Sequence, residues 1–395
     1  MGIELNNDQI YALYDLEHWW HAASSDQVFE ISGGPGTGKS FLVKYCIERL
    51  NLTNENVLYL AFMGKAASRL QREGLPAKTI HSAIYDYKEK IARDENNKII
   101  LKKNGKPKII PYFSLKDHIS HKIKLIVVDE ASMVDKNMAE DLLSFGIPVI
   151  ALGDLNQLPP VFGNPYFLVK PNVVLRQIMR QAEGNPIVWL SQQILQGNEL
   201  KYGVYGNSSV MRKSDITDFQ FKKADIVITG TNKLRYNINQ YFREYIKGIR
   251  KPEYPHIGEK VICRKNNWGQ SIDGKYYLTN GTTGFVDFIY KDSFTKNTMQ
   301  MDFRPDFTKK TFKHIEFDYN HMYAVPGSSD NVETPMAYIY DKMEYAYAIT
   351  CHSSQGSEWP GVVYLHEDFM SSSEDNKRLL YTAVTRATEY VNIVI

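Results

Sequence analysis

The stretch Gly33-Gly34-Pro35-Gly36-Thr37-Gly38-Lys39-Ser40 has the residue types and the spacing of a phosphate-binding loop. A short apolar run over 28–31 comes before it, and apolar residues at helical spacing follow it over 41–50. A strand, a glycine-rich loop and a helix in this order place backbone N–H groups at a helix N-terminus, where they bind phosphate oxygens. We expect Lys39 to contact the β- and γ-phosphates of a nucleoside triphosphate and the Ser40 hydroxyl to bind Mg²⁺. A chance glycine-rich turn is the alternative, and the flanking strand and helix argue against it.

Two acidic residues end another apolar run, and nucleotide hydrolysis requires such residues. The run over 125–128 has the composition of a buried parallel strand and leads into Asp129 and Glu130. We expect Asp129 to hold Mg²⁺, directly or through water, and Glu130 to polarise the attacking water. Gln157 follows a further apolar run over 148–154 and is placed to sense a γ-phosphate. An acid cluster that merely ends a strand is the alternative for the two carboxylates.

The composition limits the class of protein. The 395 residues are 43% hydrophobic and 23% charged, which is typical of soluble globular proteins of about two to four domains. The net charge of +2 neither requires nor excludes a nucleic-acid partner. Cys46, Cys263 and Cys351 lie far apart, which argues against a disulfide framework or a zinc site. No apolar run approaches the roughly 18 residues of a membrane span, so we expect no membrane partner and a cytoplasmic location (the host cytoplasm if a virus encodes the chain).

Changes in pattern divide the chain into parts. Apolar runs alternate with helical periodicity and predict an α/β protein, with a second α/β domain that lacks its own phosphate loop from near residue 170. Lysines gather in 88–124, where 98–110 predicts a β-hairpin with Asn104-Gly105 at its turn. Short alternating runs rich in Gly, Thr and Tyr over 255–344 predict a small β-barrel inserted into the second domain.

Nine short segments follow one another over nearly the whole chain. They are residues 7–9, 33–40, 61–67, 79–81, 129–132, 153–161, 175–181, 347–358 and 379–387. In this order they resemble the Q motif and motifs I, Ia, Ib, II, III, IV, V and VI of superfamily 1B DNA helicases, in the RecD/Dda-like branch. A phosphate loop alone is not specific, whereas motifs II, III, V and VI together are.

The resemblance implies a domain organisation. It predicts two RecA-like P-loop domains in tandem, with a small β-hairpin insertion in the first and a small SH3-like β-barrel insertion in the second. The implied parts are the ATP-binding motor domain 1A, the inserted pin subdomain 1B, the second RecA-like domain 2A and the inserted barrel subdomain 2B. Domain 1A would comprise 1–87 and 121–169, and subdomain 1B would comprise 88–120. Domain 2A would comprise 170–254 and 345–395, and subdomain 2B would comprise 255–344.

The same resemblance implies which residues bind ATP and Mg²⁺ as cofactors. Gln9 would read the adenine, and Gly356 and Glu358 would bind the nucleotide from the second domain. Arg180 and Arg386 would reach the γ-phosphate across the cleft between the domains, where arginines neutralise charge in the transition state.

Contacts with DNA are implied for eight residues of these motifs. They are Phe62, Lys65, Thr79, His81, Pro160, Thr350, His352 and Gln355. Structural hydrogen bonding is the alternative role for the threonines and histidines among them. Asn104 and Gly105 would form the tip of a pin that separates the strands.

Three functions remain open on the sequence. The first is an ATP-dependent DNA helicase that acts on single-stranded DNA and fork junctions, with replication or recombination proteins as partners. The resemblance to the RecD/Dda-like branch implies that it moves 5′ to 3′ and acts as a monomer. The second is a translocase or protein-remodelling motor that does not unwind DNA, and the predicted hairpin argues against it. The third is a nucleic-acid-binding module with an inactive ATP site, and an intact Lys39, Asp129, Glu130, Gln157 and Arg386 argue against that.

Overall fold

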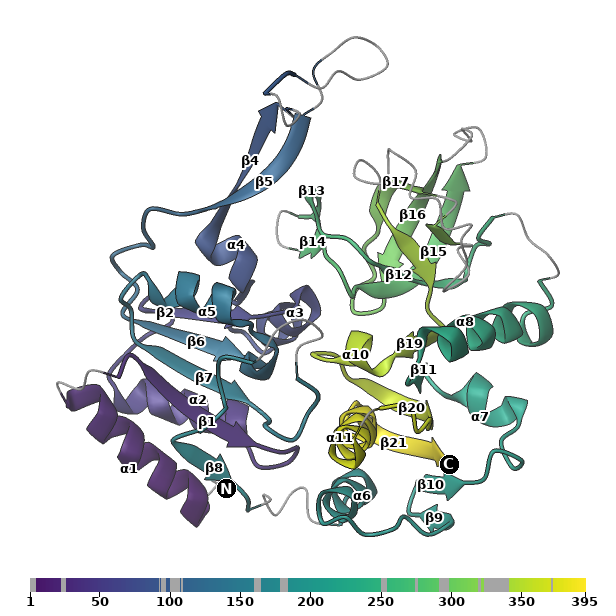
Figure 1. Ribbon diagram of the computed structural model, residues 1–395, viewed down its shortest axis with the longest axis horizontal. Coiled ribbons are helices and arrows are strands. Elements are labelled where there is room, and N and C mark those ends of the chain that lie inside the picture. Colours follow the sequence, from purple (N-terminus) through teal and green to yellow (C-terminus); the bar gives the residue numbers. More distant parts are fainter. Residues whose placement is uncertain are drawn as a thin grey trace.

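We describe the chain from a computed structural model. The description covers residues 5–22, 26–91, 93, 97–99, 107, 109–159, 165–177, 184–249, 254–273, 276–290, 298–318, 321–322, 341–370 and 372–395. Two α/β domains lie side by side, and β-structure is inserted in each (Figure 1). None of the helices in these ranges combines the length and the apolar character that spanning a bilayer would require.

The first domain is built on a sheet of six parallel strands in the order β3-β2-β6-β7-β1-β8. Its apolar runs are buried because helices cover both faces, as parallel sheets require. The strands are β1 (Val28–Gly33), β2 (Val57–Ala61), β3 (Lys78–Thr79), β6 (Leu125–Asp129), β7 (Val149–Gly153) and β8 (Val173–Leu175). The helices are α1 (Asn7–His21), α2 (Lys39–Arg49), α3 (Gly64–Arg72), α4 (Ile80–Ile84), α5 (Lys136–Leu143) and the 3₁₀ turn Ala131–Met133.

Helices α1, α2 and α3 cover one face of this sheet, and α4 and α5 cover the other. The start of α1 follows from its sequence, because the Asn6 side chain accepts a hydrogen bond from the Gln9 backbone N–H and the Gln9 side chain accepts one from the Asn6 backbone N–H. Strand β8 pairs with β1, so Val173–Leu175 belongs to the first domain. The boundary predicted at 169–170 therefore lies too early in the chain.

The second domain has a six-stranded sheet in the order β19-β11-β20-β21-β10-β9. All of its neighbours pair in parallel except β9 and β10. The strands are β9 (Gly203–Tyr205), β10 (Ser208–Met211), β11 (Ile226–Thr229), β19 (Ala348–Thr350), β20 (Trp359–Leu365) and β21 (Ala387–Val394). The helices are α6 (Pro186–Leu195), α7 (Asp218–Lys223), α8 (Asn232–Tyr241), a π-helical turn (Phe242–Ile246), α10 (Cys351–Ser354) and α11 (Ser373–Val384).

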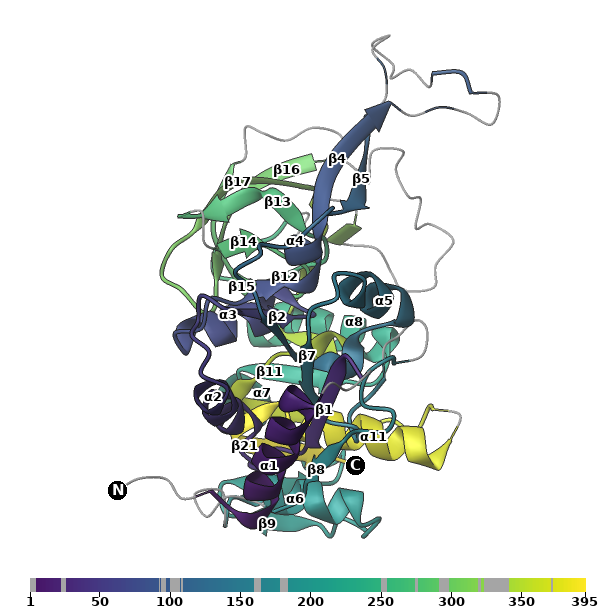
Figure 2. The same cartoon turned by 90° about the vertical axis from the view of Figure 1, so that its left-hand side faces the viewer.

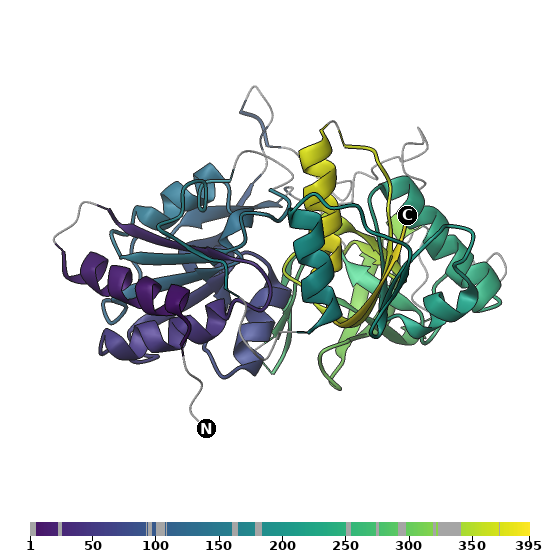
Figure 3. The same ribbon diagram turned by 90° about the horizontal axis from the view of Figure 1, so that it is seen from below.

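Helices α6 and α11 pack on one face of the second sheet, and α7 and α8 on the other. Figure 3 shows α6 and α11 on the side of the second domain that faces the first. The predicted α/β class with parallel-sheet cores is thus confirmed for both domains.

An antiparallel sheet in the order β17-β16-β15-β12-β18, which we call the inserted sheet, interrupts the second domain. The strands are β12 (Lys260–Cys263), β15 (Thr283–Tyr290), β16 (Thr298–Pro305), β17 (Phe312–Asp318) and β18 (Met343–Tyr345), and a separate pair is β13 (Asn267–Ile272) with β14 (Tyr276–Leu278). A buried ion pair between Arg243 and Glu259, at 2.7 Å, joins the inserted sheet to the second domain.

A two-stranded hairpin projects from the first domain beyond α4 (Figures 1 and 2). It pairs β4 (Tyr85–Ile91) with β5 (Ile109–Leu115), so the prediction of a hairpin confined to 98–110 is wrong. Ile109 pairs with Ile91, whereas Ile99 bridges to Arg93. The alternation of side chains in 85–91 fits a half-solvated strand. The hairpin was instead predicted around Asn104-Gly105, because that pair is a strong turn signal. The predicted tip, Asn104 and Gly105, lies outside the described residues.

Candidate active site

A cleft of about 520 Å³ lies between the carboxyl ends of β1, β6 and β7 and the second domain. It brings together ten of the residues predicted to bind or hydrolyse a nucleotide. They are Gly34, Pro35, Gly36, Gly38, Lys39, Asp129, Glu130, Gln157, Glu358 and Arg386. Both domains therefore contribute to one site, as expected for a nucleotide held between two RecA-like domains.

The phosphate loop runs from the end of β1 to the first residue of α2. Gly38 precedes the helix with φ 79°, a left-handed conformation that glycine adopts without steric cost. The Lys39 ammonium donates hydrogen bonds to the carbonyls of Gly33 and Gly34, the latter at 3.2 Å, so it lies over the loop. The Thr37 hydroxyl donates to the Gly34 carbonyl at 2.8 Å and tightens the turn. A cation at the N-terminus of α2 suits phosphate oxygens.

Asp129 and Glu130 end β6 and are almost fully buried. Glu130 has φ 53°, a conformation that is uncommon outside glycine and that often marks a functional site. Burial raises the pKa of the Glu130 carboxyl, although Arg386 across the cleft opposes this effect. A carboxylate with a raised pKa is better suited to accept a proton from water.

Arg69, which the sequence analysis missed, is a further cation beside these acids. Its guanidinium pairs with Asp129 at 2.7 Å and with Glu358, from the second domain, at 3.0 Å. Burial opposes the charge, but the two carboxylates raise the pKa of Arg69 above its usual value. One available signal was the spacing of Arg69 from Lys65, four residues apart on one face of α3.

Arg386 reaches the cleft from the turn that follows α11. It is 3% exposed, and its guanidinium donates to the carbonyls of Thr382 and Ser357 at 3.1 and 3.3 Å. These contacts hold the side chain in one orientation. Gln157 is also buried, and its Oε1 has no hydrogen-bond partner within the described part of the chain. Arg180, predicted to act with Arg386, lies outside the described residues.

Three hydrogen bonds join the loop after β7 to the second domain. The Tyr381 hydroxyl donates to Asp154 at 2.6 Å, and the Leu158 N–H donates to Thr382 at 2.9 Å. The Gln355 amide donates to the Leu158 carbonyl at 2.6 Å and is 1% exposed. Gln355 therefore links the two domains in this structure, and its contact with DNA stays a prediction.

Comparisons with known proteins agree with this arrangement. Residues 4–214, more than half of the chain, match the AAA domain family, and 345–394 match the UvrD-like helicase C-terminal domain. The ATP-dependent RecD2 DNA helicase of Deinococcus radiodurans is 28% identical over an alignment of 385 residues that covers 91% of this chain. The ATP-dependent DNA helicase dda of Enterobacteria phage T4 is 30% identical over an alignment of 274 residues that covers 62% of this chain.

The chain belongs to the superfamily 1B helicases of the RecD, Pif1 and Dda type. A crystal structure of the Pif1 helicase from Bacteroides has the same fold, with a TM-score of 0.53 and 17% identity over 99% of this chain and 92% of that one. The matches cover 46% of RecD2 and 58% of Dda, so this superfamily 1B chain spans about half the length of those relatives.

Not every predicted nucleotide ligand of this superfamily 1B chain faces the cleft. Gln9 is fully buried, and its amide donates to the Thr37 carbonyl at 3.0 Å while its oxygen accepts from Asn6. In this structure Gln9 therefore supports the phosphate loop, and the reading of adenine stays a prediction. Gly356 lines a neighbouring depression with Arg69 and Glu358. The side chain of Ser40 lies outside the description.

The predicted DNA contacts have several roles. Thr79 and Thr350 cap the N-termini of α4 and α10. This is the structural hydrogen bonding that was the alternative to a DNA contact. Lys65 is buried, contacts Thr283 of the inserted sheet at 3.2 Å and lies 4.0 Å above the Trp359 ring. Burial lowers the pKa of Lys65 to about 8. Lys65 therefore lies between the first domain and the inserted sheet in this structure, and its contact with DNA stays a prediction.

Phe62, His81 and His352 remain partly exposed and available to a ligand. Burial lowers the pKa of both imidazoles, so at neutral pH they would meet DNA as neutral rings. The His81 ring lies 5.5 Å from that of Tyr85 at the base of the hairpin. Pro160 lies outside the described residues.

The residues of the cleft fit a Mg²⁺ ion. Asp129 offers carboxylate oxygens, the ligands that Mg²⁺ prefers, and it already accepts a cation, the Arg69 guanidinium. Within the described ranges, no group of three or more His, Cys, Asp or Glu residues could hold a metal by itself. Mg²⁺ is usually bound by one or two carboxylates together with substrate phosphates, so an ion beside Asp129 would share its coordination with a bound nucleotide.

Arg69→Met should lower the free energy of unfolding by about 2–3 kcal/mol, because removing one partner of a buried ion pair leaves the other charge uncompensated. Mg²⁺ should reduce this loss, since a divalent cation can replace the guanidinium beside Asp129. Urea unfolding with and without Mg²⁺ measures both effects. Arg72→Met is the matched control on α3, because no ion pair of Arg72 is seen among the described residues. Equal losses in the two variants would contradict the role of Arg69.

Proposed function

We propose that this chain is an ATP-dependent DNA helicase that translocates on single-stranded DNA, 5′ to 3′, and unwinds duplex DNA. The observation that carries the proposal is the division of one site between two domains: Lys39, Asp129 and Glu130 lie on the first and Arg386 on the second. Because both parts are needed for hydrolysis, the reaction depends on how closely the domains approach. Domain motion coupled to hydrolysis can move a strand held across both domains.

The relatives support this activity and its substrates. RecD2 and Dda are named ATP-dependent DNA helicases, and the Bacteroides Pif1 structure is a complex with ADP-AlF3 and single-stranded DNA. The 5′ to 3′ direction follows from the resemblance to the RecD/Dda-like branch. The same resemblance favours a monomer that acts at fork junctions with replication or recombination proteins.

Each cleft residue receives a role in hydrolysis. Lys39 binds the β- and γ-phosphates, Asp129 with Ser40 would hold Mg²⁺, and Glu130 orients the attacking water and takes its proton. Bound Mg²⁺ would neutralise charge on the phosphate oxygens. Gln157 offers an unpaired oxygen to the water or the γ-phosphate, and Arg386 neutralises the transition state.

The β4–β5 hairpin is the element that we propose separates the strands, with the inserted sheet as an SH3-like barrel beside the DNA. A translocase that binds a single strand without unwinding is the second candidate. The projection of the hairpin from the motor domain favours the helicase over this translocase, because a rigid projection can split a duplex as the motor advances.

A duplex with a 5′ single-stranded tail should be unwound in the presence of ATP, whereas a 3′-tailed duplex should not. Lys39→Ala should abolish unwinding and hydrolysis while binding of single-stranded DNA persists, since Lys39 contacts the phosphates. Gel separation of labelled strands and release of phosphate give the two readouts. Hydrolysis stimulated by DNA with neither duplex unwound would favour the translocase, and wild-type turnover in Lys39→Ala would mean that the active site is elsewhere.

Arg386→Ala should lower kcat by about 10³-fold, with a much smaller change in the Kd for ATP, because its charge acts in the transition state. Steady-state turnover and binding of a fluorescent nucleotide separate the two effects. Lys377→Ala on α11 is the control, since this lysine pairs only with the exposed Glu374 among the described residues. A loss confined to nucleotide affinity would disprove the transition-state role.

Replacing residues 98–108 with a short glycine–serine link should uncouple the motor. Strands β4 and β5 remain, but the chain that connects them becomes shorter, so we expect that the duplex is no longer forced apart. Hydrolysis stimulated by single-stranded DNA should persist, and the unwinding rate should fall at least about tenfold, since each base-pair step costs about 1.4 kcal/mol to open. Unchanged unwinding would assign strand separation to another element.

A further inference from the structure

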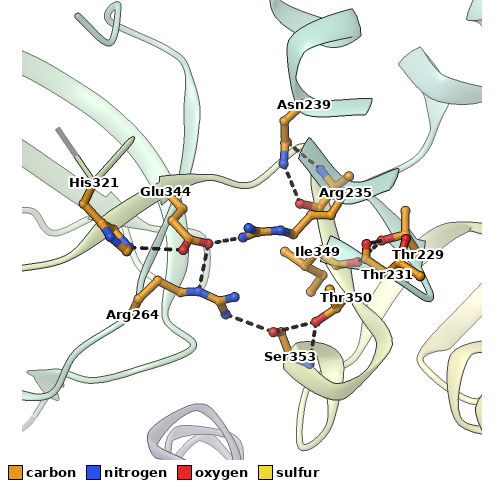
Figure 4. A network of polar contacts seen from close by, with 11 residues as sticks. Thr229, Thr231, Arg235, Asn239, Arg264, His321, Glu344, Ile349, Thr350 and Ser353 are labelled. Atoms are coloured by element: carbon orange, nitrogen blue, oxygen red, sulfur yellow. Dashed lines mark hydrogen bonds and ion pairs between the residues drawn. The ribbon is translucent and has the colours of Figure 1, made fainter. Parts of the chain in front are cut away.

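A second group of charged side chains lies where the inserted sheet meets the second domain (Figure 4). Glu344 on β18 is its centre. The carboxylate accepts contacts from Arg264 at 2.9 Å, from His321 at 3.1 Å and from Arg235 on α8. The residues of the nucleotide cleft take no part in this group.

Arg264 extends the group to the segment that follows β19. While its Nε contacts Glu344, its Nη1 donates to the Ser353 hydroxyl at 2.9 Å. The Ser353 hydroxyl in turn lies 2.9 Å from that of Thr350. Thr350 and His352, in the same segment, are predicted contacts of single-stranded DNA, so a guanidinium from the inserted sheet lies beside that predicted path.

The charges of this group do not balance. Two guanidinium groups share one carboxylate, and neither arginine has a second carboxylate partner within the described part of the chain. Burial alone would raise the pKa of Glu344, but the hydrogen bond from His321 and the two arginines lower it to about 2. An excess of positive charge in a partly buried site is stabilised by an anionic ligand.

The two arginines differ in access to a ligand. The Arg235 side chain is 12% exposed, and its Nε is buried with no hydrogen-bond partner among the described residues. Arg264 is 21% exposed, and its Nη2 makes none of the contacts drawn in Figure 4. Arg264 is therefore the member of the pair that an external phosphate can reach.

We propose that Arg264 binds a backbone phosphate of single-stranded DNA, with Glu344 and Ser353 holding its guanidinium in place. The inference rests on the proposed function, since it assumes that a single strand passes this segment. A guanidinium donates two parallel hydrogen bonds to a phosphate, and such contacts carry no base specificity. Arg264 would thus place the inserted sheet in contact with the DNA strand that the motor domains move.

The test compares Arg264→Gln with Arg235→Gln in the full chain, using a fluorescent oligothymidylate as the probe. Both substitutions remove one guanidinium from Glu344, but only the first removes the proposed phosphate contact. Arg264→Gln should weaken binding about tenfold at low salt and reduce the slope of log K against log salt concentration by about 0.7, the value for one phosphate of a single strand. Arg235→Gln should leave the slope unchanged.

Each outcome separates the hypotheses. Equal slopes in the wild type and Arg264→Gln, or equal reductions in both variants, would overturn the inference and assign the group a purely structural role. A wild type that does not bind the oligonucleotide would instead overturn the proposed function. If Arg264→Gln does not fold, Arg264→Lys decides. Lysine keeps the charge and loses the paired donors, so the slope should persist with weaker binding, and unchanged affinity would overturn the inference.

Discussion

The hydrogen bonds between the second domain and the loop after β7 determine the shape of the nucleotide cleft. Tyr381 is fully buried, and its hydroxyl donates to Asp154 of the first domain at 2.6 Å. Burial and the charge of Asp154 raise the pKa of Tyr381 well above its usual value, so the phenol stays a donor. The same hydroxyl would lie 2.8 Å from a Cβ at position 34, so glycine there lets the phosphate loop and α11 approach closely.

Charge compensation across the cleft follows from that approach. Arg69 on α3 lies between Asp129 and Glu358, one carboxylate from each domain. Two carboxylates brought together in a partly buried cleft would repel each other, and the guanidinium converts that repulsion into attraction. A ligand that changes the charge around Asp129 therefore acts on the contact between the domains as well as on the acid itself.

The inserted sheet is tied to both domains by polar contacts that are partly or fully buried. Lys65 joins it to the first domain through Thr283, and the Arg243–Glu259 pair joins it to the second. Arg264 connects it to the segment after β19. Because a buried polar group that loses its partner costs free energy, moving the inserted sheet away from either domain would cost free energy at these contacts.

The sequence alone determined the chemistry and the class of fold. The phosphate loop and the two acids at the end of β6 depend on neighbours along the chain, so local spacing predicts them. The α/β class followed from apolar runs of strand length between helical segments. Arg386 was predicted from its motif, and the structure places it in the cleft.

Only the tertiary structure identified the partners of the buried charges. Arg69 and Asp129 are 60 residues apart, Tyr381 and Asp154 are 227 apart, and Arg264 and Ser353 are 89 apart. Periodicity shows which face of an element is buried but not which distant side chain meets it. For the same reason the hairpin partner of Ile109 was missed, since register is decided by the pairing of whole strands and not by one strong turn signal.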